Sequence, residues 1–301
     1  YTGVGFSRIS VNPSLSIIYK LNYAWRFTAH ASYKERYGEM TDLYDRPYQT
    51  DYRNSVWNCG ILPVYRQQLY SVYGEYKNTA REFFATVNLT HNREWYNRIY
   101  EQRIENGQVQ RVSLPLSNHG SGYTVKSTLS KGFYDLGLKT SFLALLNISK
   151  AEQSSGGQRL PYQYRLMRLE PKVIWTPNRH WETSYQTDIR YGGNKIGERT
   201  RLAPLWNVTQ QVQLSYIFSP IEASLSVDHY HNDVNEDQSV NAVFADFSVL
   251  WKSRRWQITA TATNLFDKRT YAYTRYASLE SYTSWVRIRP REFLVAIRYR
   301  L

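Results

Sequence analysis

The sequence predicts an all-β protein that forms the wall of a transmembrane antiparallel β-barrel, with about 13 strands in this chain. Three observations support this prediction. Apolar and polar side chains alternate along segments that mostly reach the roughly 9 to 11 residues a tilted strand needs to cross a bilayer. Short and long connections alternate between these segments. The chain also contains 27 Tyr, 9 Trp and 11 Phe, a composition typical of barrel walls at the lipid–water boundary.

The alternation is clearest in residues 25–34. Trp25, Phe27 and Ala29 lie on one face of the predicted strand. Arg26 and Thr28 lie on the other face, which is the pattern of a strand with one apolar side. No segment of comparable length shows a helical period. The same pattern recurs in 15–21, 83–89, 123–129, 136–146, 167–175, 181–191, 208–218, 223–227, 243–251, 256–262 and 293–301.

The connections place the two ends of the strands in different compartments. Short turns are predicted at 22–24, 78–80, 131–133, 177–180, 219–220 and 252–255. Long polar stretches are predicted at 37–63, 96–119, 151–161, 192–204, 233–240 and 267–282. In outer-membrane barrels the short turns are periplasmic and the long loops extracellular. Five tryptophans lie within three residues of a predicted short turn, as in an interfacial girdle: Trp25, Trp175, Trp181, Trp251 and Trp256.

Bulk composition alone is that of a soluble basic protein. The net charge is +13 and the mean hydropathy is −0.59, but a barrel wall exposes only every second strand residue to lipid. A soluble sandwich or propeller is the alternative, and its strands are about half as long as those predicted. Cys59 is the single cysteine, which excludes an internal disulfide framework. Tyr1 in place of an initiator Met indicates a processed or partial chain.

Two C-terminal stretches resemble TonB-dependent outer-membrane receptors of the Bacteroidetes type. Thr263–Lys268 contains Asn-Leu-Phe-Asp, a motif of the penultimate strand in that family, and Arg289–Leu301 is similar to its final strand. The family usually ends in Phe, whereas this chain ends in Leu301. The resemblance implies that residues 1–301 are the C-terminal part of a 22-stranded barrel. The plug domain and the N-terminal strands would then lie outside this chain, in missing sequence or another chain.

Ligand-binding candidates are the aromatic and Arg residues of three long loops, because such loops carry function on a rigid scaffold. The twelve candidates are Tyr44, Arg46, Tyr48, Trp57, Tyr96, Arg98, Tyr100, Arg103, Arg269, Tyr271, Tyr273 and Arg275. Charged residues such as Lys126, Arg190 and Asp188 are expected on the lumenal side of the strands. There they line a wet interior and contact a plug, or attract anionic substrates. A third interpretation sets outward-facing cations of the loops against lipopolysaccharide phosphates.

Motifs for catalysis and metal binding are absent from the sequence. His229 and His231 share a strand face but are interpreted as interfacial residues. Asp42, Asp45 and Asp51 lack the spacing of calcium ligands. The Gly-rich stretch 192–197 lacks the spacing of a phosphate-binding loop and is predicted to be a loop. We therefore expect no enzymatic activity, no cofactor, no metal site and no nucleic-acid partner.

The resemblance implies an outer-membrane receptor that takes up a scarce solute, such as a ferric siderophore, a glycan or a peptide. Rearrangement of the plug, driven through TonB, would supply the mechanism. The expected partners are outer-membrane lipid and lipopolysaccharide, the rest of the barrel and plug, TonB, and a surface lipoprotein or other complex subunits. The alternative is a non-transporting barrel that serves as a structural or secretion-associated subunit of an outer-membrane complex.

Overall fold

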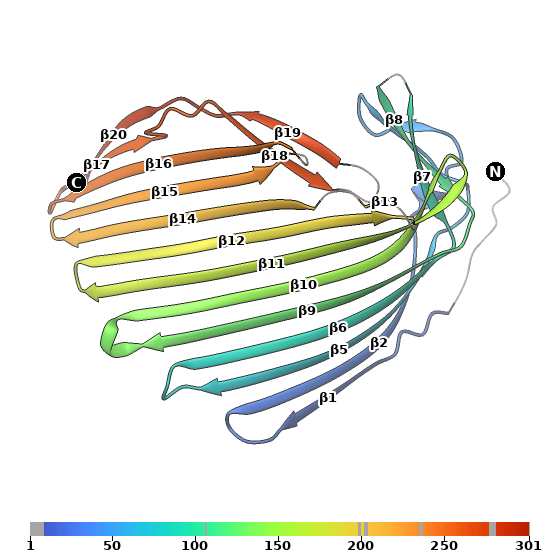
Figure 1. The fold of residues 1–301 in the computed structure, drawn as a ribbon, viewed down its shortest axis with the longest axis horizontal. Helices are drawn as coiled ribbons and strands as arrows, with labels where there is room; N and C mark the ends of the chain where they lie inside the picture. Colours follow the sequence, from blue (N-terminus) through green and yellow to red (C-terminus); the bar gives the residue numbers. More distant parts are fainter. Residues whose placement is uncertain are drawn as a thin grey trace.

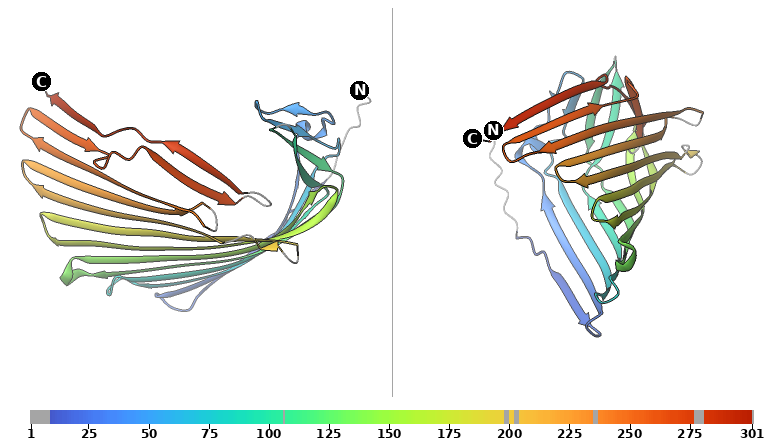
Figure 2. Two further views of the ribbon diagram at one scale, coloured as in Figure 1. Left: turned by 45° about the horizontal axis from the view of Figure 1, so that its top comes forward. Right: turned by 90° about the vertical axis from the view of Figure 1, so that its left-hand side faces the viewer.

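A computed structural model describes residues 9–105, 107–197, 200–201, 204–234, 237–276 and 281–300. These residues form an open, curved wall of antiparallel strands (Figures 1 and 2). The wall contains β1 (Ser14–Lys20), β2 (Trp25–Tyr37), β5 (Val64–Asn78), β6 (Phe83–Tyr96), β9 (Asn118–Phe133), β10 (Leu138–Ser155), β11 (Gln158–Asn178), β12 (Trp181–Ile196), β14 (Leu205–Phe218), β15 (Ile221–Asp233), β16 (Ser239–Lys252), β17 (Trp256–Thr263) and β20 (Glu292–Tyr299).

Each wall strand pairs antiparallel with the wall strands before and after it in the chain. This order confirms the predicted fold class and the predicted number of wall strands. β1 and β20 lie at opposite edges (Figure 1), and among the described residues they do not pair with each other. The wall is therefore a trough rather than a closed barrel. Within the described part of the chain, no helix has the length and apolarity needed to cross a membrane.

The register gives the wall one apolar face and one polar face. Ala29 lies opposite Ile17 on β1 and opposite Val72 on β5. Val72 in turn faces Leu89 on β6. Val72 and Leu89 are 53% and 48% exposed, which would be costly in water and is favourable against lipid. The period-2 alternation predicted from the sequence thus produces a continuous apolar outer face.

The five tryptophans near the short turns lie on this outer face. Trp25, Trp181 and Trp256 are the first residues of β2, β12 and β17. All five are more than a third exposed. We call the end of the wall that carries the short turns the hairpin end. Five tryptophans at this end are the arrangement expected of an interfacial girdle.

Two of the tight hairpins are built on an Asn side chain. Asn22 Oδ1 accepts hydrogen bonds from the backbone N–H groups of Ala24 and Trp25. Asn178 Oδ1 accepts them from His180 and Trp181. Such Asx turns satisfy backbone donors that the ladder leaves unpaired, so the turn position follows from the local sequence.

Three predicted connections are wrong in position. The predicted turn 131–133 belongs to β9, and the chain turns afterwards through the 3-10 helix η2 (Tyr134–Leu136) and Gly137, whose φ is 59°. The predicted loop 151–161 is a continuous hairpin of β10 and β11. Its turn is Gly156–Gly157, with φ values of 57° and 77°. The stretch 192–197 lies mostly in β12, which ends at Ile196.

The long connections all lie at the end opposite the hairpins, called the long-loop end below (Figure 1). The first contains η1 (Met40–Leu43), β3 (Tyr48–Gln49) and β4 (Asn54–Trp57), and the second contains β7 (Ile99–Glu105) and β8 (Gln108–Leu114). β4 and β8 pair in parallel, which joins the two loops. Farther along the chain, β13 (Thr200–Arg201) pairs antiparallel with the end of β12. β18 (Thr270–Tyr276) and β19 (Ser281–Arg287) form a separate two-stranded sheet between β17 and β20.

Candidate functional site

A cavity of about 760 Å³ lies on the polar face of the wall at the long-loop end, and we call it cavity A. The ends of β6, β9, β10 and β11 line it together with β7 and β8. Three of the sequence-predicted residues, Tyr96, Arg98 and Tyr100, are among its lining residues. The structure therefore brings together most of the candidates from the second loop.

Tyr100 is the centre of an Arg–aromatic cluster in cavity A. The guanidinium carbon of Arg111 lies 3.7 Å from the centroid of the Tyr100 ring, and that of Arg98 lies 4.9 Å from it. Such contacts contribute roughly 0.5 to 2 kcal/mol, depending on solvation. Arg98 Nη1 also pairs with Asp42 Oδ1 at 2.9 Å. The first loop thus holds Arg98 in place, while the more exposed Arg111 is available to a ligand.

Glu94 supplies a fixed negative charge on the wall side of the same cavity. Its carboxylate accepts hydrogen bonds from Tyr65, Gln67, Asn92 and Tyr96, at 2.9 to 3.1 Å. Four donors on one carboxylate hold both oxygens in place. The cavity thus offers an oriented acceptor group opposite its Arg–aromatic cluster.

Glu101 anchors the β7–β8 hairpin above the cavity. Its carboxylate is buried, with only 4% of the residue exposed. It accepts hydrogen bonds from Ser154 Oγ at 2.7 Å, Arg103 Nε at 2.9 Å and the backbone N–H of Gly157 at 3.1 Å. These bonds, that of Ser154 first, hold the pKa of Glu101 below its usual value. The hairpin is thereby tied to the β10–β11 turn.

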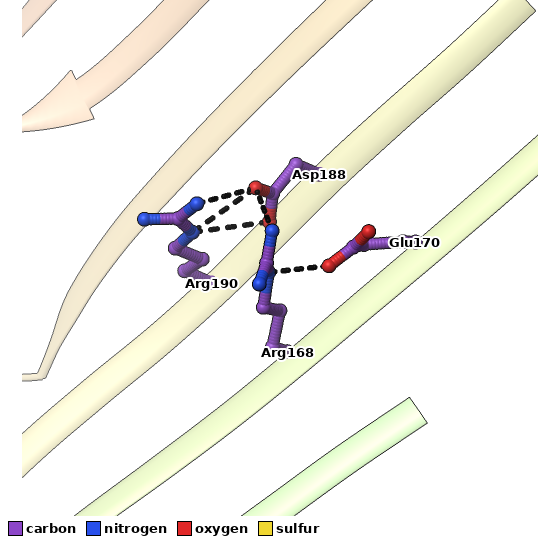
Figure 3. Close-up of polar contacts among 4 residues, drawn as sticks. All are labelled: Arg168, Glu170, Asp188 and Arg190. Carbon is purple, nitrogen blue, oxygen red and sulfur yellow. Dashed lines mark hydrogen bonds and ion pairs between the residues drawn. The ribbon is translucent and has the colours of Figure 1, made fainter. Parts of the chain in front are cut away.

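A second cavity, cavity B, has a volume of about 630 Å³ and lies farther along the polar face. Its most ordered feature is the cluster of Arg168, Glu170, Asp188 and Arg190 (Figure 3). Arg168 donates to both oxygens of Asp188, at 3.1 and 3.0 Å. Arg190 Nη2 donates to Asp188 Oδ2 at 2.6 Å. Asp188 is therefore shared between two guanidinium groups.

The strand register explains why this cluster forms. Arg168 and Arg190 are direct cross-strand partners on β11 and β12. Like charges in that position repel each other. Asp188 precedes Arg190 by two residues on the same face, so its carboxylate lies diagonally between the two guanidinium groups and neutralises the repulsion. The side chain of Arg190 remains half exposed toward the cavity.

Tyr271 and Tyr273 of the last loop line cavity B from β18. The Tyr271 hydroxyl accepts a hydrogen bond from Asn232 Nδ2 at 3.1 Å, and its ring lies edge-on to Tyr230 at 5.3 Å. The sheet formed by β18 and β19 is thus fixed to β15. Cavity B combines aromatic hydroxyls with a half-exposed Arg, a set that binds polar or anionic groups.

The remaining candidates lie elsewhere. Among the described residues that line the two cavities there is none from the first-loop set of Tyr44, Arg46, Tyr48 and Trp57. Tyr44 and Tyr48 contact each other edge-on at 6.0 Å, and Trp57 Nε1 donates to the carbonyl of Asp45. Arg46 is exposed. Arg103 pairs with Glu101, and Arg269 pairs with Asp267 at 2.8 Å. The side chain of Arg275 lies outside the described residues.

Sequence reasoning missed Glu94, Arg111 and Arg168 as cavity residues. Arg168 could have been found, because it alternates with Met167 and Leu169 and so belongs to the polar face. Glu94 shares the parity of Asn92 and Tyr96 in the same way. Arg111 carries no such signal, because its position depends on the tertiary packing of β8 against the wall.

Comparisons with known proteins give the fold. No protein-family model matches the chain, and a search of curated proteins gives no match. The FrpB iron transporter from Neisseria meningitidis (F3-3 variant) is similar in structure, with a TM-score of 0.52 and 9% identity over 88% of this chain and 44% of that one. Its F5-1 variant in the apoprotein form gives a TM-score of 0.50 and 8% identity, over 89% and 44%. The ferric yersiniabactin uptake receptor FyuA from Yersinia pestis gives 0.49 and 7%, over 96% and 50%.

The chain thus spans less than half of the length of the FrpB structures. At identities below a tenth, the similarity extends to the fold alone. That fold is the wall of an outer-membrane-type β-barrel, as the register and the apolar outer face independently require.

Proposed function

We propose that this chain forms the C-terminal part of the barrel of a TonB-dependent outer-membrane receptor that takes up a scarce polar solute. The proposal rests on the difference between the two faces of the wall. Its outer face is apolar and is bordered at the hairpin end by tryptophans, while its inner face holds both polar cavities at the long-loop end. Ligand sites at the outer mouth of a lumen suit capture from outside the cell.

The cavities favour a ligand that carries anionic and hydroxyl groups. Arg111 in cavity A and Arg190 in cavity B are the more exposed members of their clusters, and each is accompanied by tyrosines. Fixed carboxylates, Glu94 and Asp188, keep the lining from being uniformly basic. A ferric siderophore, an acidic glycan or a peptide would satisfy this mixture. We propose binding and uptake, rather than catalysis, as the role of the site.

The proposed mechanism requires partners outside this chain. Among the described residues, β1 and β20 each have one unpaired edge. These edges would join the further strands that complete a barrel, since backbone groups left unsatisfied in lipid are costly. A plug domain would fill the lumen and contact the charged inner face. TonB would supply the energy for release, and the location would be the bacterial outer membrane.

An uptake assay in cells tests this proposal. The native gene is deleted from its host, and the uptake of labelled ferric siderophores, acidic oligosaccharides and short peptides is compared in deletion and complemented cells. We expect gene-dependent uptake of one of these classes, abolished by a protonophore because TonB depends on the proton gradient. Complementation with R190A or R111A should reduce that uptake, and the surface variant Y52A, whose residue is exposed in the first loop, should not.

The proposal fails if the native protein does not fractionate with the outer membrane. It also fails if the deletion changes the uptake of no class, or if uptake continues in the presence of the protonophore. The last result would indicate a passive barrel.

A further inference from the structure

An apolar groove of about 560 Å³ crosses the outer face of the wall over β1, β2, β5, β6 and β9. Its floor is low because Ala29 and Ala31 on β2 lie between larger neighbours. Ala31 faces Leu15 on one side and Tyr70 on the other. The groove is thus built by the choice of small side chains on one strand, at a place where neighbouring positions carry large ones.

Stacked rings border the groove toward the long-loop end. The ring of His91 lies 4.2 Å from that of Tyr123 and 6.4 Å from that of Tyr70, with interplanar angles of 19° and 15°. His91 Nδ1 lies 2.9 Å from the carbonyl oxygen of Gly122. The protonated Nδ1 donates a hydrogen bond to that carbonyl, which leaves Nε2 as an acceptor.

Arg93 uses that acceptor. Its Nε donates to His91 Nε2 at 3.3 Å, so the clamped imidazole orients the guanidinium on the outer face. The residue is exposed, and among the described residues no carboxylate is recorded within ion-pair distance of it. Arg66 lies on the adjacent strand β5, two residue pairs farther toward the long-loop end. Within the described chain, its one ion pair is a 3.8 Å contact with Glu35. Two cations therefore stand beside the border of an apolar groove.

The position along β6 gives the depth of these cations in a membrane. β6 begins at Phe83 at the hairpin end, so Arg93 is the eleventh residue of the strand. A tilted strand needs roughly 9 to 11 residues to cross the hydrocarbon. Of the outward-facing residues before it, Val87 and Leu89 are apolar, and only His91, directly before Arg93, is polar. Arg93 thus reaches the level of the outer-leaflet headgroups, while the groove lies within the outer half of the hydrocarbon.

We propose that this surface binds one molecule of lipopolysaccharide, with an acyl chain in the groove and a phosphate on Arg93 and Arg66. This inference rests on the proposed location of the chain in the outer membrane. The headgroup of lipopolysaccharide is favoured over that of a phospholipid because a third cation, Lys150, lies near Arg93 and Arg66. Lys150 also lines cavity A, but the register places its side chain on the outer face, on the same rung of the sheet as Arg93 with Ser121 between them. The separation is two strand spacings, roughly 10 Å, which suits a headgroup with two phosphates.

Lipid analysis of the purified native protein tests this proposal. The full-length protein is extracted from outer membranes in mild detergent and washed extensively. The amounts of lipopolysaccharide and phospholipid per protein are then measured by mass spectrometry. We expect about one retained lipopolysaccharide per wild-type protein. R93E should lower its retention about tenfold, the loss expected for one charge-assisted hydrogen bond. A29L should lower it by filling the groove without changing any charge.

R179E is the matched control. Arg179 Nε also donates to a neighbouring histidine, His180 Nε2, at 3.1 Å, but at the hairpin end of the wall. This variant should retain lipopolysaccharide as the wild type does. The proposal is overturned if R93E and A29L retain wild-type amounts, if R179E loses as much as R93E, or if the retained lipid is phospholipid. Heat-modifiable mobility on gels identifies any variant that fails to fold, and A29L, whose new side chain faces lipid, provides a test independent of R93E.

Failure of this inference and failure of the proposed function give different results. R93E leaves cavities A and B unchanged, so uptake should persist when lipopolysaccharide retention is lost. A protein that carries no lipopolysaccharide but still supports protonophore-sensitive uptake would contradict the inference alone.

Discussion

The side-chain amide of Asn264 donates a hydrogen bond of 2.8 Å to the backbone carbonyl of Arg289, 25 residues farther along the chain. The same amide nitrogen also donates to the carbonyl of Lys268, and its oxygen accepts from the Lys268 N–H. Asp267, three residues later, accepts from the backbone N–H of Arg291. The Asn-Leu-Phe-Asp motif is thus a clamp that fixes the entry of β20 to the end of β17.

Replacing Asn264 with Ala should destabilise the last strand pair. Asn264 is 6% exposed and has a φ of 51°, so the substitution loses three hydrogen bonds and also strains the backbone. We expect a loss of about 2 kcal/mol, measured as the midpoint of denaturant unfolding in lipid vesicles. N264G relieves the backbone strain but not the lost bonds. If N264G restored wild-type stability, the clamp would be a backbone effect and not a set of hydrogen bonds.

Replacing Asp188 with Asn should destabilise the facing pair of Arg168 and Arg190. The neutral amide no longer offsets the repulsion between two guanidinium groups on adjacent strands, and we expect a loss of about 1 to 3 kcal/mol. The double variant D188N/R168Q removes the repulsion as well and should recover part of that loss. Additive effects in a double-mutant cycle would contradict the shared-carboxylate arrangement.

Acidification should release the β7–β8 hairpin. The pKa of Glu101 is lowered from its usual 4.5 by the Ser154, Arg103 and Gly157 hydrogen bonds. A depressed folded-state pKa stabilises the anchored form above the unfolded value, and that stabilisation is lost as the pH falls through the folded value. Hydrogen exchange of the hairpin amides should therefore accelerate, relative to the wall, below about pH 4.5. E101Q should show this acceleration already at pH 7 and no further change on acidification. If the exchange rate of the wild-type hairpin relative to the wall were the same at pH 7 and below about pH 4.5, the Glu101 anchor would be excluded.

Tyr100 should matter for binding through the face of its ring. In the uptake assay, Y100F should behave as the wild type, because the cation–π contacts of Arg98 and Arg111 need the ring and not the hydroxyl. Y100A should weaken apparent affinity by about tenfold. Y44A is the control, because Tyr44 lies outside both cavities. An equal loss in Y100F and Y100A would instead assign the ligand contact to the hydroxyl group.

The sequence predicted the wall well because a membrane enforces its alternation. Leu15, Phe27 and Leu89 must face lipid, and a shift by one residue would bury polar side chains in hydrocarbon. Only a few strand ends were predicted at the wrong residues, and the hairpin at Ser155–Gln158 shows why. There β10 and β11 continue above the apolar band, where polar residues occupy both faces and the period-2 signal ends. Its Gly-Gly turn, with two positive φ values, was the remaining local sign of a hairpin.

The cavities could be predicted only in part. Tyr96, Arg98 and Tyr100 were identified as loop aromatics and arginines, and they line cavity A together. Tyr44 and Trp57 have the same composition, yet they pack within the first loop. Composition cannot distinguish the two groups, because the difference depends on the parallel pairing of β4 with β8 and on the Arg98–Asp42 ion pair. Both are contacts between segments far apart in sequence.

Because every wall strand pairs with its nearest wall neighbours in chain order, the wall is a linear array of hairpins. Its stability should be close to a sum of hairpin and interface contributions, as in solenoid proteins. A duplication or deletion of one hairpin would then change the circumference by two strands and leave the inside–outside alternation of all the others in phase. Such a wall can be widened or narrowed in evolution without redesigning the cavities that it carries.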